Sequence, residues 1–410
     1  MIHYFPGSFG HFLVILAFIS SIIATYAFAK SINNNQSWAR FAKGAFYVHA
    51  IAIFGVVATL FAMISGHMFE YHYVYQYTSK ILPVYYQVSS FWNGQEGSFL
   101  LWMFWNAVLG LILIHTNKSW RAPMMAVFTF TQVFLVSMIM GVVVLDVKIG
   151  SSPFLLLRDV LNDPIFKMQP DFIPEDGRGL NPLLQNYWMV IHPPTLFLGF
   201  ATTVIPFAYA VGGLLTGRLK EWIRPALPWA QFSAAVLGVG ILMGAYWAYE
   251  TLNFGGYWNW DPVENAIYVP WLILVAALHT MIAFKKSNVA LKASIILVLC
   301  TYILIVYSTF LTRSGVLGNA SVHSFTDLGL SGQLLIYLFV FIILSVILTA
   351  RVWKQIPGSK EETQHLTING LEGIMNGDKI AQRFGHLNIV NVDKAIMHPV
   401  VGKSLTSLGL

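Results

Sequence analysis

The sequence predicts an all-α polytopic membrane protein with about nine transmembrane helices and a tryptophan-rich outward, periplasmic loop. Of its 410 residues, 56% are hydrophobic and 10% are charged, whereas about 25% of residues are charged in a soluble protein. So few charges cannot coat a water-soluble surface, which excludes a soluble enzyme, a disordered chain and a fibrous protein. The basic residues behind the net charge of +6 are scattered in short loops, so they indicate contact with a lipid bilayer and no nucleic-acid partner.

Nine runs reach the roughly 20 apolar residues that a membrane-spanning helix needs. Away from their ends they contain no Asp or Glu, and we find no strong internal repeat, which argues against a secondary transporter. The expected helices are residues 11–29, 44–67, 98–115, 122–145, 193–215, 226–246, 263–284, 289–311 and 332–350.

Lys and Arg divide unevenly between the loops, and this imbalance predicts the orientation. The short loops on one side hold eleven basic residues, whereas the short loops 68–97, 247–262 and 312–331 hold only Lys80 and Arg313. We therefore expect the N-terminus outside and the C-terminus inside. Residues 1–352 form the predicted transmembrane domain, and the polar residues 353–410 form a cytoplasmic tail or a truncation remnant.

The outward segment 247–271 is dense in aromatic side chains around a Gly-Gly pair, where a polar loop would be expected. An interfacial aromatic belt accounts for two or three of them. A flat platform for a large planar ligand accounts for the whole set, and composition leaves both interpretations open. The aromatic residues are Trp247, Tyr249, Phe254, Tyr257, Trp258, Trp260, Tyr268 and Trp271.

Two short motifs predict helix starts. In "DPVE", Asp261 is the expected N-cap, Pro262 the first helical residue and Glu264 the third, so Asp261 would contact a ligand only indirectly. In "SSFWNGQEGSFLLW", either Glu96 or Ser98 caps the third helix, or the loop forms a second wall of an outward site.

Two histidines lie in outward segments on either side of the aromatic segment. His192 precedes Pro193 and is expected to be extended, at the mouth of a helix that begins with the proline. His323 lies in the outward loop 312–331. Each alone is best explained as a surface histidine, but two neutral imidazoles can also ligate a haem iron from opposite faces.

Three further side chains are candidates for a site. Arg313 would either pair with a haem propionate or extend its charge to the interface. His279 lies roughly 22 Å along the seventh helix at 1.5 Å per residue, so it could ligate a second, buried haem, relay protons, or bond a neighbouring helix. His49 has the same alternatives, with helix packing favoured.

Five motifs together resemble those of the cytochrome c maturation haem lyases of the CcmF/CcsA type, whose signature is a tryptophan-rich WWD loop. The resemblance covers most of residues 80–350, in the family's order, although Asn259 separates Trp258 from Trp260 where the family often has adjacent tryptophans. The motifs are "WNGQEGSFLLW", "IHPPTLFLGF", "WNWDPVENA", "ALHT" and "FLTRSGVLGNASVH".

The resemblance implies a site for each part of the haem chemistry. Haem b would dock outside at the WWD loop, on Trp258, Trp260 and Asp261, and His192 and His323 match the two outward axial ligands. The same site would include Tyr257, Trp247 and Arg313. His279 matches the first of two intramembrane histidines that hold a second, permanent haem; longer members carry the other in later spans, so this chain is either truncated or completed by another polypeptide.

The resemblance also implies a function in the bacterial inner (cytoplasmic) membrane. The family receives haem from a haem chaperone and attaches it to the CxxCH thiols of apocytochrome c, alongside thiol-handling assembly proteins and with quinol as the electron source. We assign no catalytic residue, because thioether formation of this kind depends on positioning. The alternative is a non-catalytic haem transport or export subunit that hands haem to a chaperone.

Overall fold

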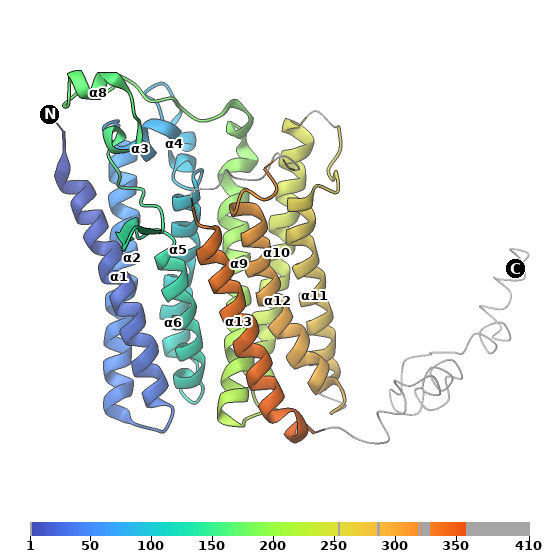
Figure 1. Ribbon diagram of the computed structural model, residues 1–410. Helices are drawn as coiled ribbons and strands as arrows, with labels where there is room; N and C mark the ends of the chain where they lie inside the picture. Colours follow the sequence, from blue (N-terminus) through green and yellow to red (C-terminus); the bar gives the residue numbers. More distant parts are fainter. Residues whose placement is uncertain (1, 253–254, 285–287, 319–320, 322–328, 358–410) are drawn as a thin grey trace, which may run out of the picture. The chain divides into compact units, whose positions relative to one another are not determined.

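The computed structural model describes residues 2–252, 255–284, 288–318, 321 and 329–357, and most of them are helical (Figure 1). The chain divides into two compact units, residues 1–279 with 295–353 and residues 280–294 with 354–410. The described part of the second unit contains the end of one long helix and the start of the next. The predicted tail lies outside the described residues beyond Pro357.

Eight helices in the described part of the chain are long and apolar enough to cross a membrane, which confirms the predicted polytopic all-α fold. Most of their ends lie within a few residues of the predicted ones, and α1 and α2 begin seven or eight residues earlier than predicted. They are α1 (Tyr4–Ser31), α2 (Gln36–Ser65), α5 (Gln95–Thr116), α9 (Tyr187–Thr216), α10 (Ile223–Thr251), α11 (Pro262–Phe284), α12 (Ala290–Arg313) and α13 (Ser331–Val352).

The predicted span 122–145 is shorter than expected. Its helix α6 (Arg121–Ser137) has 17 residues, at the lower limit for a membrane span. The valines that follow form a hairpin of β1 (Val142–Val144) and β2 (Val147–Ile149). Leu145 and Asp146 both have positive φ, as the tight two-residue turn of a hairpin requires, and β-branched residues favour strands.

Most of the short helical elements lie at one end of the long helices, which we call the outer end (Figure 1). The chain begins there, and α13 finishes at the opposite end. The outer-end elements include α3 (His72–Tyr77), α4 (Val84–Ser90), α7 (Leu157–Val160), α8 (Pro164–Met168) and the 3-10 turn η1 (Pro182–Leu184); a second 3-10 turn, η2 (Trp353–Gln355), follows α13.

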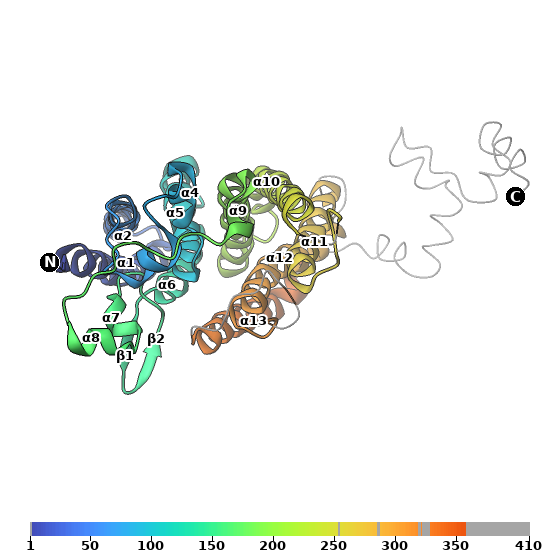
Figure 2. The ribbon, with the colours of Figure 1, turned by 90° about the horizontal axis from the view of Figure 1, so that it is seen from above.

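Helix α9 is the most enclosed of the eight spans. Within its most apolar stretch 89% of the residues are buried, against 22% for α11. Helix α9 packs against α5, α6, α10 and α13, and Figure 2 shows it between α5 and α10. The exposed apolar residues of α11, such as Val269 and Leu272, suit a lipid surface. The buried residues of α9 begin at Leu196, and the cavity described next lies at the less buried outer end of the helix.

Candidate functional site

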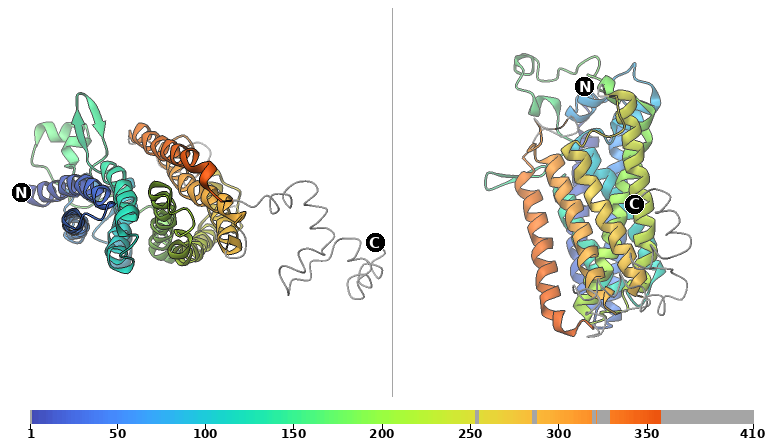
Figure 3. Two further views of the ribbon diagram at one scale, coloured as in Figure 1. Left: turned by 90° about the horizontal axis from the view of Figure 1, so that it is seen from below. Right: turned by 90° about the vertical axis from the view of Figure 1, so that its right-hand side faces the viewer.

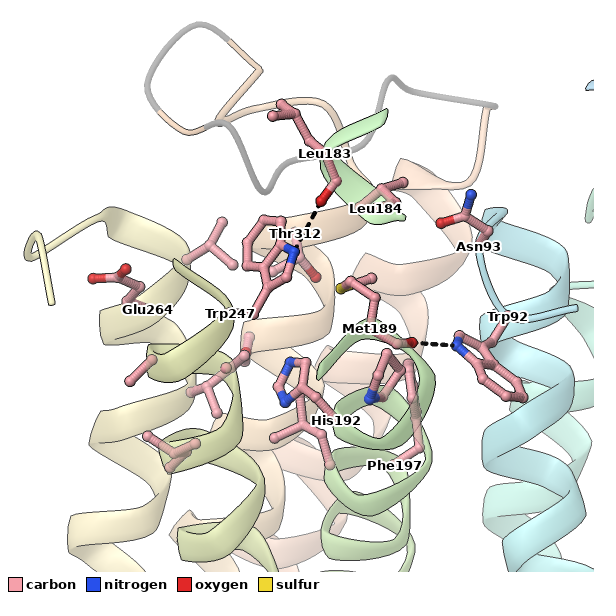
Figure 4. A pocket seen from close by; sticks show the side chains of 18 of the residues that line it. Trp92, Asn93, Leu183, Leu184, Met189, His192, Phe197, Trp247, Glu264 and Thr312 are labelled. Atoms are coloured by element: carbon pink, nitrogen blue, oxygen red, sulfur yellow. Dashed lines mark hydrogen bonds between the residues drawn. The ribbon is translucent and has the colours of Figure 1, made fainter. Parts of the chain in front are cut away.

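A cavity of about 370 Å³ lies at the outer end of α9, between it and α10, α11 and α12, with η1 beside it (Figure 4). Most of its lining is apolar, with a small number of polar groups, which is the usual composition of a ligand pocket. The polar and aromatic side chains used below are Trp92, Asn93, His192, Phe197, Trp247, Trp258, Glu264 and Arg313.

The prediction that His192 is extended at a helix mouth is wrong. Helix α9 begins five residues earlier, where the Asn186 side chain accepts a hydrogen bond from the Trp188 backbone N–H at 2.8 Å. His192 is thus helical. Pro193 has no N–H to donate to the Met189 carbonyl, and the Trp92 indole donates to that oxygen instead, at 3.1 Å. This contact replaces the missing helical bond and allows prolines inside the helix.

The His192 imidazole lies against α10. Its Nδ1 is 2.8 Å from the Gly240 carbonyl oxygen, which can only accept, so Nδ1 carries the proton. In the neutral ring this bond makes Nε2 the basic nitrogen, the arrangement that second-shell bonds impose on metal-binding histidines. Gly244 lies against the same ring: a Cβ there would be 2.8 Å from His192 Cε1 and 3.2 Å from Nε2. Helix α10 therefore fixes both the tautomer and the position of the ring.

The loop before α5 forms a wall of the cavity through Trp92 and Asn93. The Tyr73 hydroxyl donates to the Phe91 carbonyl at 2.8 Å and accepts from the Gly94 N–H at 3.1 Å, so it holds this loop in place. The N-cap of α5 is Gly94, which has no capping side chain. The structure thus supports the wall that the sequence offered as one alternative, and the other alternative, a cap by Glu96 or Ser98, is not found.

Arg313 ends α12 and lines the cavity. Only 8% of the residue is exposed, and its guanidinium lies 5.7 Å from the Phe99 ring centre and 6.0 Å from that of Phe197. A side chain that extends to the interface would be exposed, so that interpretation is wrong. Glu96 is also buried and accepts from the Ser151 hydroxyl at 2.6 Å. A guanidinium at a cavity wall can donate hydrogen bonds to an anionic group of a ligand.

The predicted cap at Asp261 is confirmed. Asp261 Oδ1 accepts from the Val263 N–H at 2.7 Å, and Glu264 Oε2 accepts in return from the Asp261 N–H at 3.2 Å, which is a reciprocal capping box. The Ser321 hydroxyl also donates to Asp261 Oδ1, at 2.7 Å. This last bond joins the loop before α13 to the start of α11.

The aromatic platform divides into two parts. Trp247 and Trp258 line the cavity, and the Trp247 indole donates to the Leu183 carbonyl of η1 at 3.0 Å. Trp260 is 71% exposed with φ of +54°, and Tyr257 stacks on Tyr249 at 4.2 Å between ring centres. The single flat platform that the sequence offered as one interpretation is therefore not found: some of the aromatic side chains line a cavity and others lie outside it.

The structure brings His192, Trp247, Trp258 and Arg313 together, while other predicted residues lie elsewhere. His279 is on an exposed face of α11, where its Nδ1 lies 2.8 Å from the carbonyl oxygen of Val275 in its own helix. His323 lies outside the described residues. His49 packs α2 against α1 through a 2.9 Å bond to the Ala17 carbonyl, as the sequence favoured.

Sequence analysis missed the glycines of α10 and the segment η1. Gly240 and Gly244 are four residues apart, so they share a helix face, and that spacing was a visible signal. No sequence pattern indicates that Leu183 of η1 lies at the cavity, because its partner Trp247 is 64 residues away in the chain. Contacts of that separation depend on the tertiary fold.

These features define a class: a polytopic α-helical membrane protein with an aromatic, histidine-containing cavity at one end of its helices. The profile of the family described as "Cytochrome C assembly protein" matches residues 92–317, more than half of the chain. The chain belongs to this family. The match covers the cavity-lining elements from Trp92 through Arg313.

Two relatives show how much of a longer protein the match covers. The cytochrome c-type biogenesis protein CcmF of Pseudomonas aeruginosa is 34% identical over 78% of this chain and 46% of its own length. That of Escherichia coli is 36% identical over 67% of this chain and 40% of its own length. The chain spans about half the length of such relatives.

A solved structure titled "Cytochrome c Heme Lyase CcmF" is similar in fold. Its TM-score is 0.62 at 24% identity, over 89% of this chain and 59% of that one. This likeness supports the arrangement of the helices.

Proposed function

We propose that the chain binds haem in the outer-end cavity and promotes its covalent attachment to apocytochrome c. The observation that carries this proposal is the His192 imidazole, held with Nε2 as its basic nitrogen at the wall of an apolar cavity that also contains a buried guanidinium. A flat apolar macrocycle with a central metal and two carboxylates matches those three features.

Different residues of the cavity would hold different parts of the haem. His192 would bind the iron on one face, and Arg313 would pair with a propionate. Trp247 and Trp258 would cover the macrocycle and exclude water. His323 is the proposed ligand of the other face, and His279 the proposed ligand of a second haem; both assignments come from the family resemblance.

The attachment step needs positioning rather than acid–base catalysis. Each thiol adds across one haem vinyl group: the S–H bond and the C=C π bond break, and C–S and C–H bonds form, so no electron is gained or lost. Holding the vinyl groups beside two thiols supplies the rate enhancement through proximity. The lone cysteine of this chain, Cys300, is in a membrane span, so the thiols would belong to the substrate.

The proposal also covers the membrane, the orientation and the partners of the protein. Relatives named for cytochrome c-type biogenesis come from bacteria, so we place this chain in the bacterial inner membrane, with the outer end and the N-terminus in the periplasm. A haem chaperone, apocytochrome c, thiol-handling proteins and quinol are its proposed partners.

The test is the haem content and visible spectrum of the chain in nanodiscs, beside His192→Ala, His323→Ala and His279→Ala. We expect the unmodified chain to contain haem, and we expect His192→Ala and His323→Ala to lose it. Haem lost only with His279 would move the site to α11 and refute a site in the cavity. Adding an apocytochrome peptide then separates the two functions: thioether formation supports the lyase, and binding without it supports a haem carrier.

A further inference from the structure

The hairpin β1–β2 exposes apolar side chains outside the helices. Val143, Val144 and Val147 are 67%, 51% and 62% exposed, and Leu145 at the turn is 93% exposed. Figure 2 and the right-hand view of Figure 3 show the hairpin projecting sideways, across the direction of the helices. An isolated two-stranded ribbon is at best marginally stable in water, so something must cover this one.

The strand register gives the hairpin one apolar face. Val142 pairs with Ile149 and Val144 with Val147, and directly opposed residues point to the same face. That face therefore carries four β-branched side chains. The other face carries Val143 opposite Lys148. With Asp146 in the turn, the hairpin has no net charge, so it offers little to a charged partner.

The base of the hairpin is fixed at the level where a membrane span begins. The Gly150 N–H donates to Gln333 Oε1 at 2.7 Å, and Gln333 Nε2 donates to the Ser137 carbonyl at 3.3 Å. Gln333 is the third residue of α13, and Ser137 is the last of α6. One turn further along α13, Ile336 begins its exposed apolar face. The hairpin thus leaves the protein at the boundary between apolar and polar surroundings.

We propose that the β1–β2 hairpin lies in the headgroup layer of the bilayer, with its four-residue apolar face against lipid. The hairpin leaves the protein beside the first turn of α13, one turn before the exposed apolar residues of that helix begin at Ile336, and this neighbour favours lipid over a protein partner. Lys148 and Asp146 would remain among the headgroups. The hairpin would then fix the depth of the following segment, which reaches the cavity at Leu183.

The test places a fluorescent label on the hairpin of the full chain in nanodiscs. In a Cys300→Ser background, the label is attached to Val144→Cys. Its fluorescence is then measured twice, once with lipids that carry a quencher near the headgroup and once with iodide in the aqueous phase. We expect quenching by the lipid probe to exceed that by iodide at least twofold. Val143→Cys, on the opposite face, is expected to give a smaller ratio.

Met168→Cys is the matched control, because Met168 is a 75% exposed apolar residue of α8 at the outer end and lies outside the hairpin. It should respond mainly to iodide. Stronger iodide than lipid quenching at Val144 would overturn the proposal. Protection of Val144 from both probes would also overturn it, since a protein would then cover the hairpin.

Discussion

Replacing Gly244 with alanine tests whether α10 positions the His192 ring. The new Cβ would lie 2.8 Å from His192 Cε1, whereas ordinary contact begins at 3.4 Å, so the ring and α10 must separate by about 0.6 Å to restore it. A binding group must be held within about 0.5 Å of its working position. A displacement of about 1 Å can cost 100-fold. We therefore expect haem affinity to fall by roughly 10- to 100-fold.

Gly199→Ala is the control for a general disturbance of the same helix pair. Its Cβ would lie 2.9 Å from Leu237 Cα, also between α9 and α10, and no His192 atom is among its nearest neighbours. Both variants should lose stability, by about 1–3 kcal/mol for overpacking. Gly44→Ala meets nothing within 4 Å and lies inside α2, so it should instead stabilise the protein by about 0.5–1 kcal/mol.

The assay is haem titration of each folded variant in nanodiscs, followed by the Soret band and by thermal unfolding. Gly244→Ala should weaken binding and shift the band, whereas Gly199→Ala should lower only the unfolding temperature. Equal haem affinity and equal spectra in the two variants would refute the positioning argument. This comparison requires that His192→Ala loses haem. If His192→Ala keeps its haem, the proposed function itself is refuted.

Three other predictions follow from the outer end. Asp261→Ala removes the cap of α11 and should cost about 1 kcal/mol in thermal unfolding, whereas Asp261→Asn, which keeps an accepting oxygen, should retain most of it. Arg313→Met should weaken haem binding about 10- to 100-fold, as for a charge-assisted hydrogen bond, but leave haem dimethyl ester unaffected; an equal loss for both would contradict the propionate contact. Burial, and secondarily Arg178, lowers the pKa of His72 below its ordinary 6.5, so the folded state binds fewer protons than the unfolded state. The stability of α3 should therefore fall as the pH drops below 6.5. Hydrogen exchange of the α3 amides should show this loss of stability, and His72→Gln should abolish the pH dependence.

Much of the fold could be predicted because it depends on local properties of the chain. Span length and hydropathy are properties of about 20 consecutive residues, and eight of the predicted spans form long helices, most of whose ends lie within a few residues of the expected ones. The Asp261 cap was predictable for the same reason, since its partners Val263 and Glu264 are two and three residues away. The span at 122–145 was mispredicted because hydropathy does not distinguish an apolar helix from an apolar hairpin.

His192 shows where local rules fail. The rule that a residue before proline is extended assumes that the lost helical bond has no substitute. Here Trp92, 97 residues away in sequence from Met189, donates to the carbonyl that Pro193 leaves open. A substitute donor from a loop that is distant in sequence cannot be inferred from the proline motif.

The sequence by itself determined that this chain is a helical membrane protein, which segments span, where α11 is capped and which family motifs it carries, because each follows from neighbouring residues. Only the tertiary structure decided that His192, Trp247, Trp258 and Arg313 share one cavity and that His279 does not. Those side chains come from α9, α10, α12 and a loop, and the close packing of the α10 glycines against α9 positions the His192 ring. Such packing depends on shape complementarity between helices distant in sequence, which hydropathy does not encode.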